Sequence, residues 1–161
     1  MLVEAQVTID GSKMAVWAAI TNIEGAASII SGIKKIEIVE KPPHGLVGLR
    51  WRETRMLFGK PATVEKWITD AAENAFYTTR AEDSGFVFLS TMRISENNSG
   101  VMLTSAHETK PQGIAATLQS LPMILFKGVV KKAILQDLNE YKAAVEQERS
   151  IAVERRQGEA S

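Results

Sequence analysis

The chain has 161 residues, of which 45% are hydrophobic and 24% charged, and its formal net charge is zero. That length suits one globular domain, and the balanced charge gives no general attraction to nucleic acid or to anionic lipid, so we expect no nucleic-acid partner. The absence of cysteine excludes disulfides, thiol nucleophiles and thiolate metal sites.

The N-terminal segment predicts a strand followed by two short helices. Residues 3–9 (VEAQVTI) alternate apolar and polar side chains, as in a half-buried strand. Asp10 or Ser12 can cap a helix that runs to about residue 22, and residues 23–31 (IEGAASIIS) predict a second short helix. The alternating start does not resemble a signal peptide, and we expect a cytoplasmic protein.

The middle of the chain predicts an antiparallel meander. Short segments of alternating polarity follow one another, and turns rich in Pro, Gly, Asn and Asp separate them. The predicted strands are residues 33–40, 46–55, 62–69, 75–81, 86–95 and 101–109.

The C-terminal part predicts a long helix over residues 114–148. From Lys127 onward its apolar residues share one face. Residues 111–126 carry no charge, and a helix start that is apolar all round needs two partners. One is the sheet, and the other can be a bound apolar molecule, the short helices or another subunit. The uncharged stretch is shorter than the ~20 residues that span a bilayer, so we expect no membrane span.

These elements predict one α+β domain. Helices gathered on one side of an antiparallel sheet give that fold class. We expect residues 1–148 to form the domain and residues 149–161 to form a charged tail that frays.

The order of the elements and three stretches of sequence resemble the helix-grip fold of START, pollen-allergen and polyketide cyclase/dehydrase-type proteins (SRPBCC). The stretches are residues 7–40, which include a "VW" pair in the first helix, residues 47–60 with a "G-x-R" strand and a glycine turn, and residues 127–146. The resemblance covers roughly residues 3–146. It implies a curved sheet of about seven strands that wraps around the long C-terminal helix and leaves a hydrophobic cavity between them.

A simple rule assigns strand residues to that cavity. An unpaired buried charge is costly, so Arg and Lys within a strand, such as Lys66, are placed on the outer face. The residues predicted to point inward include Trp51, Glu53, Arg55, Glu65, Trp67, Tyr77, Phe88, Ser90, Met92, Ser105 and His107. From the long helix we add Leu118, Pro122, Leu125 and Phe126. This composition suits a small-molecule pocket of roughly 300–1,000 Å³.

Two of these residues are candidates for catalysis. His107 has a reference pKa of about 6.5, near neutrality, which suits acid–base chemistry; the alternative is a core histidine bonded to a neighbour. Glu65, if buried, would have a raised pKa and act as a general acid; the alternative is an edge position in contact with water. Glu53 and Arg55 can orient the polar end of a ligand or form an ion pair at the sheet rim.

The sequence therefore predicts a protein that binds a small hydrophobic or aromatic molecule between sheet and helix. Trp51, Trp67 and Tyr77 can stack on a flat ligand or belong to the ordinary core. One alternative is an enzyme of the polyketide cyclase/dehydratase type, and another is an interaction module or homodimer that uses the apolar helix surface. The two histidines lie far apart and no nucleotide-binding loop is present, so we expect neither a metal nor a cofactor.

Overall fold

The computed structural model describes residues 1–57, 59–114 and 125–160. In chain order its helices and strands are β1 (Leu2–Ile9), α1 (Lys13–Thr21), α2 (Ala26–Ile29), β2 (Ile33–Glu40), β3 (Arg50–Leu57), β4 (Lys60–Ala72), β5 (Phe76–Asp83), β6 (Phe86–Asn97), β7 (Gly100–Pro111) and α4 (Lys127–Glu159).

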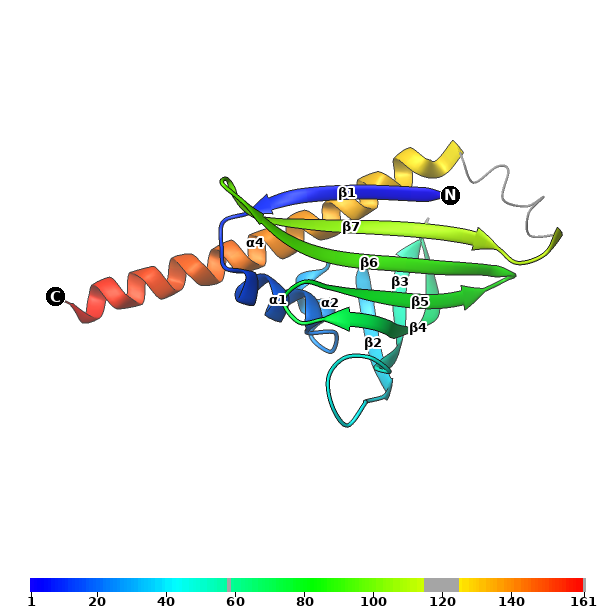
Figure 1. Cartoon of the computed structure of the whole chain (residues 1–161), viewed down its shortest axis with the longest axis horizontal. Helices are drawn as coiled ribbons and strands as arrows, with labels where there is room; N and C mark the ends of the chain where they lie inside the picture. Colours follow the sequence, from blue (N-terminus) through cyan, green and yellow to red (C-terminus); the bar gives the residue numbers. More distant parts are fainter. Residues whose placement is uncertain (58, 115–124, 161) are drawn as a thin grey trace.

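The seven strands form one antiparallel sheet in the order β1-β7-β6-β5-β4-β3-β2. Because β1 and β2 are the two edges, α1 and α2 carry the chain from one edge of the sheet to the other. Both short helices and α4 lie on the same side of the sheet, and α4 crosses it (Figure 1). The predicted α+β helix-grip architecture, with a curved sheet around the long helix, is confirmed.

Local sequence explains several element boundaries. The side-chain oxygen of Ser12 accepts a hydrogen bond of 3.1 Å from the Ala15 amide and so caps α1. Ser84 and Gly85 both have positive φ (50° and 80°), as the tight turn between β5 and β6 requires. The register between β4 and β5 shifts between Ile68 and Asp70, and such a bulge bends the strand and increases its twist.

One face of α4 packs on the sheet. Its buried residues are Ile134, Leu138, Tyr141 and Val145, spaced by three and four residues as in an amphipathic helix. Polar contacts fix the helix further, since Glu140 accepts hydrogen bonds from the amide and the hydroxyl of Ser31 at 2.8 and 2.6 Å.

A tightly packed region, here called the closed core, lies where β1 leads into α1. It joins residues of β1, α1, β7 and α4 that are almost fully shielded from solvent: Ile9, Val16, Ile20, Val101, Leu103 and Val145. A Cβ added at Gly11 would come 2.8 Å from a methyl carbon of Val145, so glycine lets β1 and α4 approach here.

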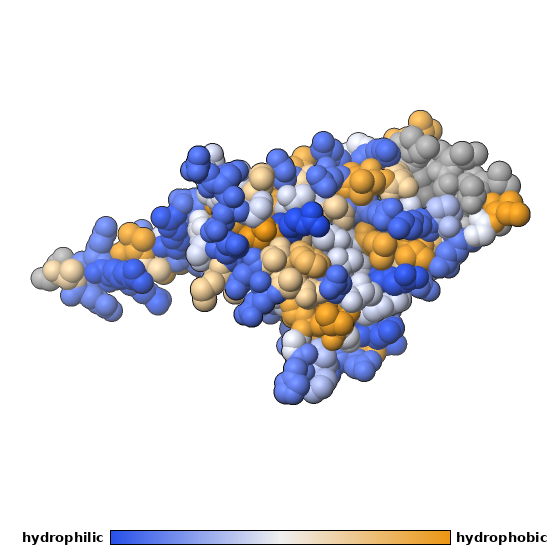
Figure 2. Space-filling view, in the orientation of Figure 1, coloured by the Kyte–Doolittle hydropathy of each residue, from blue (hydrophilic) through white to orange (hydrophobic). Residues whose placement is uncertain are grey.

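The C-terminal end of α4 extends beyond the sheet (Figure 1). Residues 149–159, expected as part of a charged tail, form its last turns, and their side chains are exposed. Arg149 pairs with Asp10 at the base of this extension, and hydrophilic residues cover most of it (Figure 2). Within the described residues no helix combines the length and the hydrophobicity needed to cross a membrane.

Candidate functional site

A partly enclosed cavity of about 90 Å³ lies between the inner face of the sheet and α4. This volume is smaller than the roughly 300–1,000 Å³ that the residue types suggested. The lining residues come from α2 and the loop before it, from the six strands β2 to β7 and from α4. They are Ile23, Ala26, Ile33, Trp51, Glu53, Arg55, Lys66, Tyr77, Thr79, Ser90, Met92, Ser105, His107, Ile134, Asp137, Leu138 and Tyr141.

Much of this lining was placed inward from the sequence. The positions predicted correctly are Trp51, Glu53, Arg55, Tyr77, Ser90, Met92, Ser105 and His107. The alternation of strand side chains brings them to one face, and the sheet register brings their strands side by side. Their roles toward a ligand stay predictions.

Glu53 is the centre of the polar part of the cavity. It is only 6% exposed, yet its carboxylate accepts hydrogen bonds from Arg55 Nε at 2.5 Å, Lys66 Nζ at 2.8 Å and Trp51 Nε1 at 3.3 Å. Arg55 Nη1 in turn lies 2.8 Å from Asp137 Oδ2 on α4. Lys66, Glu53, Arg55 and Asp137 thus form a charged row of alternating sign that connects β4, β3 and α4.

Burial and the neighbouring charges act against each other along this row. Burial alone would raise the pKa of Glu53, but the charges and hydrogen bonds of Lys66 and Arg55 outweigh it and lower the pKa to about 2. For Asp137, burial raises the pKa, and Arg55 only partly opposes that shift. Glu53 is therefore ionised at neutral pH. In the predicted Glu53–Arg55 pair Glu53 is buried and Arg55 is half-buried, and both line the cavity.

His107 is held by two serine hydroxyls. Ser90 Oγ lies 3.0 Å from Nδ1 and Ser105 Oγ lies 2.9 Å from Nε2. Burial, followed by the positive charges of Lys66 and Arg55, lowers the pKa of His107 to about 4. The imidazole is therefore neutral at neutral pH, so one ring nitrogen donates to one serine and the other accepts from the second.

Tyr77 contributes its ring to the cavity, while its hydroxyl has a structural partner. The hydroxyl donates a hydrogen bond of 3.0 Å to the Ile20 carbonyl of α1. Burial raises the pKa of Tyr77 well above its ordinary value, so the side chain stays neutral. The ring also meets Trp17 edge to face at 6.3 Å between centroids. Tyr77 therefore docks α1 onto the sheet and forms one wall of the cavity.

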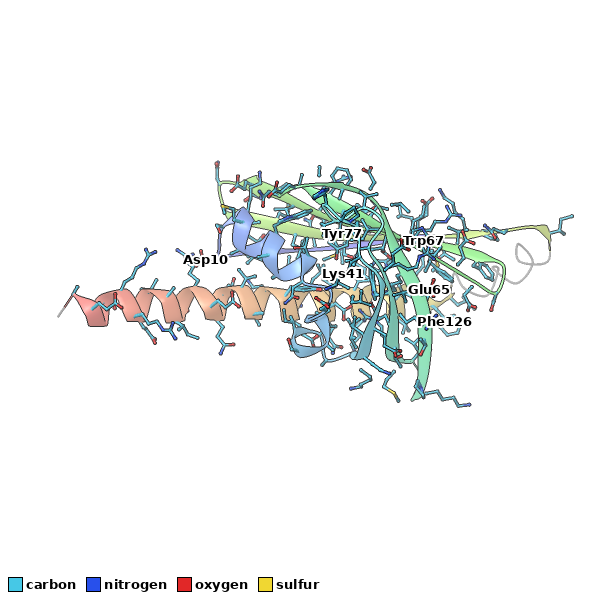
Figure 3. All side chains as sticks on the ribbon, turned by 90° about the horizontal axis from the view of Figure 1, so that it is seen from below. Asp10, Lys41, Glu65, Trp67, Tyr77 and Phe126 are labelled. Atoms are coloured by element: carbon cyan, nitrogen blue, oxygen red, sulfur yellow. The ribbon has the colours of Figure 1, made fainter. Side chains whose placement is uncertain are left out.

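The inward orientation predicted for Glu65 and Trp67 is wrong. Lys66, between them, points into the cavity and pairs with Glu53, so its two neighbours lie on the outer face. In Figure 3 Tyr77 lies on the α1 side of the sheet, whereas Glu65 and Trp67 lie on the opposite side. The rule that Lys marks the outer face fails here because a buried carboxylate on the adjacent strand compensates its charge.

The outer-face surroundings of Glu65 also argue against its predicted role. Its carboxylate accepts a hydrogen bond of 2.8 Å from Arg50 and pairs with Arg52 at 3.3 Å. The hydrogen bond from Arg50 is the main reason why its pKa is lowered rather than raised. The guanidinium of Arg50 also lies 4.5 Å from the centre of the Trp67 ring, so these residues form a cluster on the surface.

Three further predicted ligand contacts, Phe88, Leu125 and Phe126, do not line the described cavity. Phe88 shares the inner face with Ser90, but its ring contacts Phe86, at 6.3 Å between centroids, and does not line the cavity. Leu125 and Phe126 are 84% and 49% exposed, and neither is among the described lining residues. Leu118 and Pro122 lie outside the described residues.

Sequence reasoning missed two charged residues of the cavity. Asp137 stands three residues after Ile134 and four before Tyr141, on the buried face of α4, and this helical spacing is a signal that could have found it. Lys66 gives no such signal, because only the pairing of β3 with β4 brings it to Glu53.

Comparison with known proteins supports the fold through structure alone. No protein-family model matches the sequence, and no curated protein matches it either. A START superfamily protein from Mycobacterium smegmatis is similar in structure, with a TM-score of 0.75 at 15% identity. The alignment covers 91% of this chain and 97% of that protein. The Zhui aromatase/cyclase from Streptomyces sp. R1128 has a TM-score of 0.70 at 20% identity over 91% and 94%.

A third similar structure is longer than this chain. The di-domain aromatase/cyclase StfQ from the steffimycin biosynthetic pathway matches with a TM-score of 0.74 at 11% identity. The alignment covers 92% of this chain but 51% of StfQ, so the chain spans about half of that protein. Together the sheet order, the position of α4 and these likenesses show that the chain has the START-like helix-grip fold.

Proposed function

We propose that the protein binds a small molecule, mostly apolar with one polar end, in the cavity between the sheet and α4. The observation that carries this proposal is the two-sided lining. Apolar side chains such as Met92, Ile134 and Leu138 form one part of the wall, and the charged row centred on Glu53 forms another. A mostly apolar pocket with a few convergent polar groups is the usual form of a small-molecule site.

The cavity volume sets the size of the ligand. About 90 Å³ is less than the about 150 Å³ of an engineered cavity that holds benzene. A one-ring compound would therefore fill the cavity and reach its mouth, and a larger one requires a flexible side chain such as Met92 to repack. Two of the structural neighbours are named aromatase/cyclases, which agrees with a small organic ligand.

Affinity for simple probes should be modest. A ring that buries about 100 Å² of apolar surface gains about 2.5 kcal/mol, and loss of rigid-body freedom opposes binding. We expect dissociation constants of about 10 mM or weaker for one-ring compounds. A free ligand concentration of about ten times the dissociation constant should add about 1.4 kcal/mol to the free energy of unfolding. For a chain of this size, the melting temperature should then rise by about 3–6 °C.

Thermal unfolding with increasing phenol or toluene tests the proposal. We expect the melting temperature to rise with ligand concentration. Ser90→Leu should abolish the rise because its methyl groups occupy the cavity, whereas Thr91→Leu, next to it but on the outer face, should leave the rise intact. A flat response to every probe, or an equal rise in Ser90→Leu, would contradict binding in this cavity. Mass spectrometry of molecules that copurify would then identify the natural ligand.

We place ligand binding ahead of the enzyme alternative. His107 has a pKa of about 4, and both of its ring nitrogens are hydrogen-bonded to serines. It is therefore a weak general base, and at neutral pH too little of it is protonated for it to act as a general acid. Catalysis and self-association stay predictions.

A further inference from the structure

The charges in the cavity wall cancel. Among the described lining residues, Lys66 and Arg55 are positive and Glu53 and Asp137 are negative, which sums to zero. The pairs are close, at 2.8 Å for Lys66–Glu53, 2.5 Å for Arg55–Glu53 and 2.8 Å for Arg55–Asp137. Each charge therefore has a partner of opposite sign before any ligand enters.

The titratable side chains nearby add no charge at neutral pH. The lowered pKa of His107 keeps its imidazole neutral. The raised pKa values of Tyr77 and Tyr141, both caused mainly by burial, keep the phenols protonated. A charged ligand would consequently leave the cavity with an uncompensated charge.

The members of the charged row differ in how much of their hydrogen-bonding capacity is already used. Glu53 already accepts from Trp51, Arg55 and Lys66. An ammonium and a guanidinium carry more N–H donors than Lys66 and Arg55 use on their described carboxylate partners. The unused capacity therefore includes N–H donors of Lys66 and Arg55, which can donate to a ligand oxygen.

From this balance we infer that the cavity selects an uncharged ring compound with a carbonyl or similar acceptor oxygen, in preference to a carboxylate or a cation of the same shape. The inference rests on the proposed function and names the ligand class for that site. A carboxylate would have to compete with Glu53 for Lys66 and Arg55. A cation would be repelled by the positive charges of Lys66 and Arg55. A purely apolar ring would leave the spare donors without an acceptor.

A set of compounds with nearly the same planar shape separates these possibilities. It comprises benzamide and acetophenone (neutral, with a carbonyl), benzoate (anion), benzamidinium (cation) and α-methylstyrene (apolar). Measured by calorimetry or NMR titration at about pH 7, the two carbonyl compounds should bind about tenfold more tightly than either ion. They should bind about threefold more tightly than α-methylstyrene, the gain of one hydrogen bond.

The results distinguish this inference from the proposed function. If benzoate, benzamidinium or α-methylstyrene binds as tightly as the carbonyl compounds, the inference is overturned while ligand binding stands. If no compound binds, the proposed function fails, and the inference fails with it.

Two variants that change the charge balance test its cause. Glu53→Gln leaves the lining with one net positive charge and should raise the affinity for benzoate, relative to the carbonyl compounds, by about tenfold. Lys66→Met leaves one net negative charge and should raise the relative affinity for benzamidinium. Because Lys66 retains 27% side-chain exposure and Glu53 keeps Arg55, Lys66→Met tests the inference even if Glu53→Gln does not fold. Glu65→Gln, on the outer face, should keep the wild-type order; an unchanged order in both cavity variants would overturn the explanation.

Discussion

The same helix, α4, covers two regions of opposite character. Over the closed core it presents Val145 to aliphatic side chains that are almost completely shielded from solvent. Over the cavity it presents Asp137 and Tyr141 to a wall that contains Glu53 and His107. The contrast separates a region that stabilises the fold by apolar burial from one where paired polar groups border open space.

The largest expected difference between the two regions is in the cost of removing an apolar side chain. Leu103→Ala should lower the free energy of unfolding by about 3–5 kcal/mol because Leu103 is 0% exposed and its loss creates a new void. Met92→Ala, which only enlarges an existing cavity, should cost about 1–2 kcal/mol. Urea unfolding of both variants measures this, and equal costs would remove the distinction between closed core and cavity.

The next effect concerns the charged row. Glu53→Gln should lower the free energy of unfolding by about 2 kcal/mol, because Lys66 and Arg55 lose their shared carboxylate in a buried setting. The outer-face control Glu65→Gln should cost much less, because its ion pairs with Arg50 and Arg52 lie at the surface. Denaturant unfolding of the two variants in the same buffer compares them directly, and a larger loss in Glu65→Gln would reverse our assignment of the two faces.

The pH dependence of stability provides a third contrast, since the closed core has no titrating group among its residues. His107 has a pKa of about 4 in the folded protein, against about 6.5 when exposed. As the pH falls from about 6.5 to about 4, the unfolded chain takes up this proton first, so the free energy of unfolding should fall by about 2 kcal/mol.

The variant His107→Gln isolates that contribution. Its stability should change less than that of the wild type between about pH 6.5 and 4. Glu53, whose pKa is lowered to about 2, should act in the adjoining window, because stability that it contributes above about pH 4.5 is lost as the pH falls toward 2. Parallel pH profiles for wild type and His107→Gln would show that the histidine is not buried as described.

The smallest expected effect is at the projecting end of α4. Removing residues 149–161 should change the free energy of unfolding by less than about 1 kcal/mol, because the described side chains there are exposed and Arg149–Asp10 is a surface ion pair. Neither the closed core nor the cavity includes these residues. Calorimetry of the shortened chain tests the predicted boundary at residue 148, and a loss of several kcal/mol would contradict it.

The sequence by itself determined the order of the elements and much of the cavity wall. Alternation placed Glu53, Ser90 and His107 on one face, because successive side chains of a strand point to opposite sides. It also placed Val3 and Ile9 in the core. These patterns are local, so they can be read without knowing which strands meet.

Only the tertiary structure decided what lies opposite each residue. The orientation of Lys66 depends on a carboxylate that the β3–β4 pairing brings within 2.8 Å, and without that partner its charge would favour solvent. The same applies to Asp137, whose place on the buried side of α4 is compensated by Arg55. The cavity volume is a small difference between the space enclosed by sheet and helix and the side chains that fill it, and this difference arises only when all of them pack together.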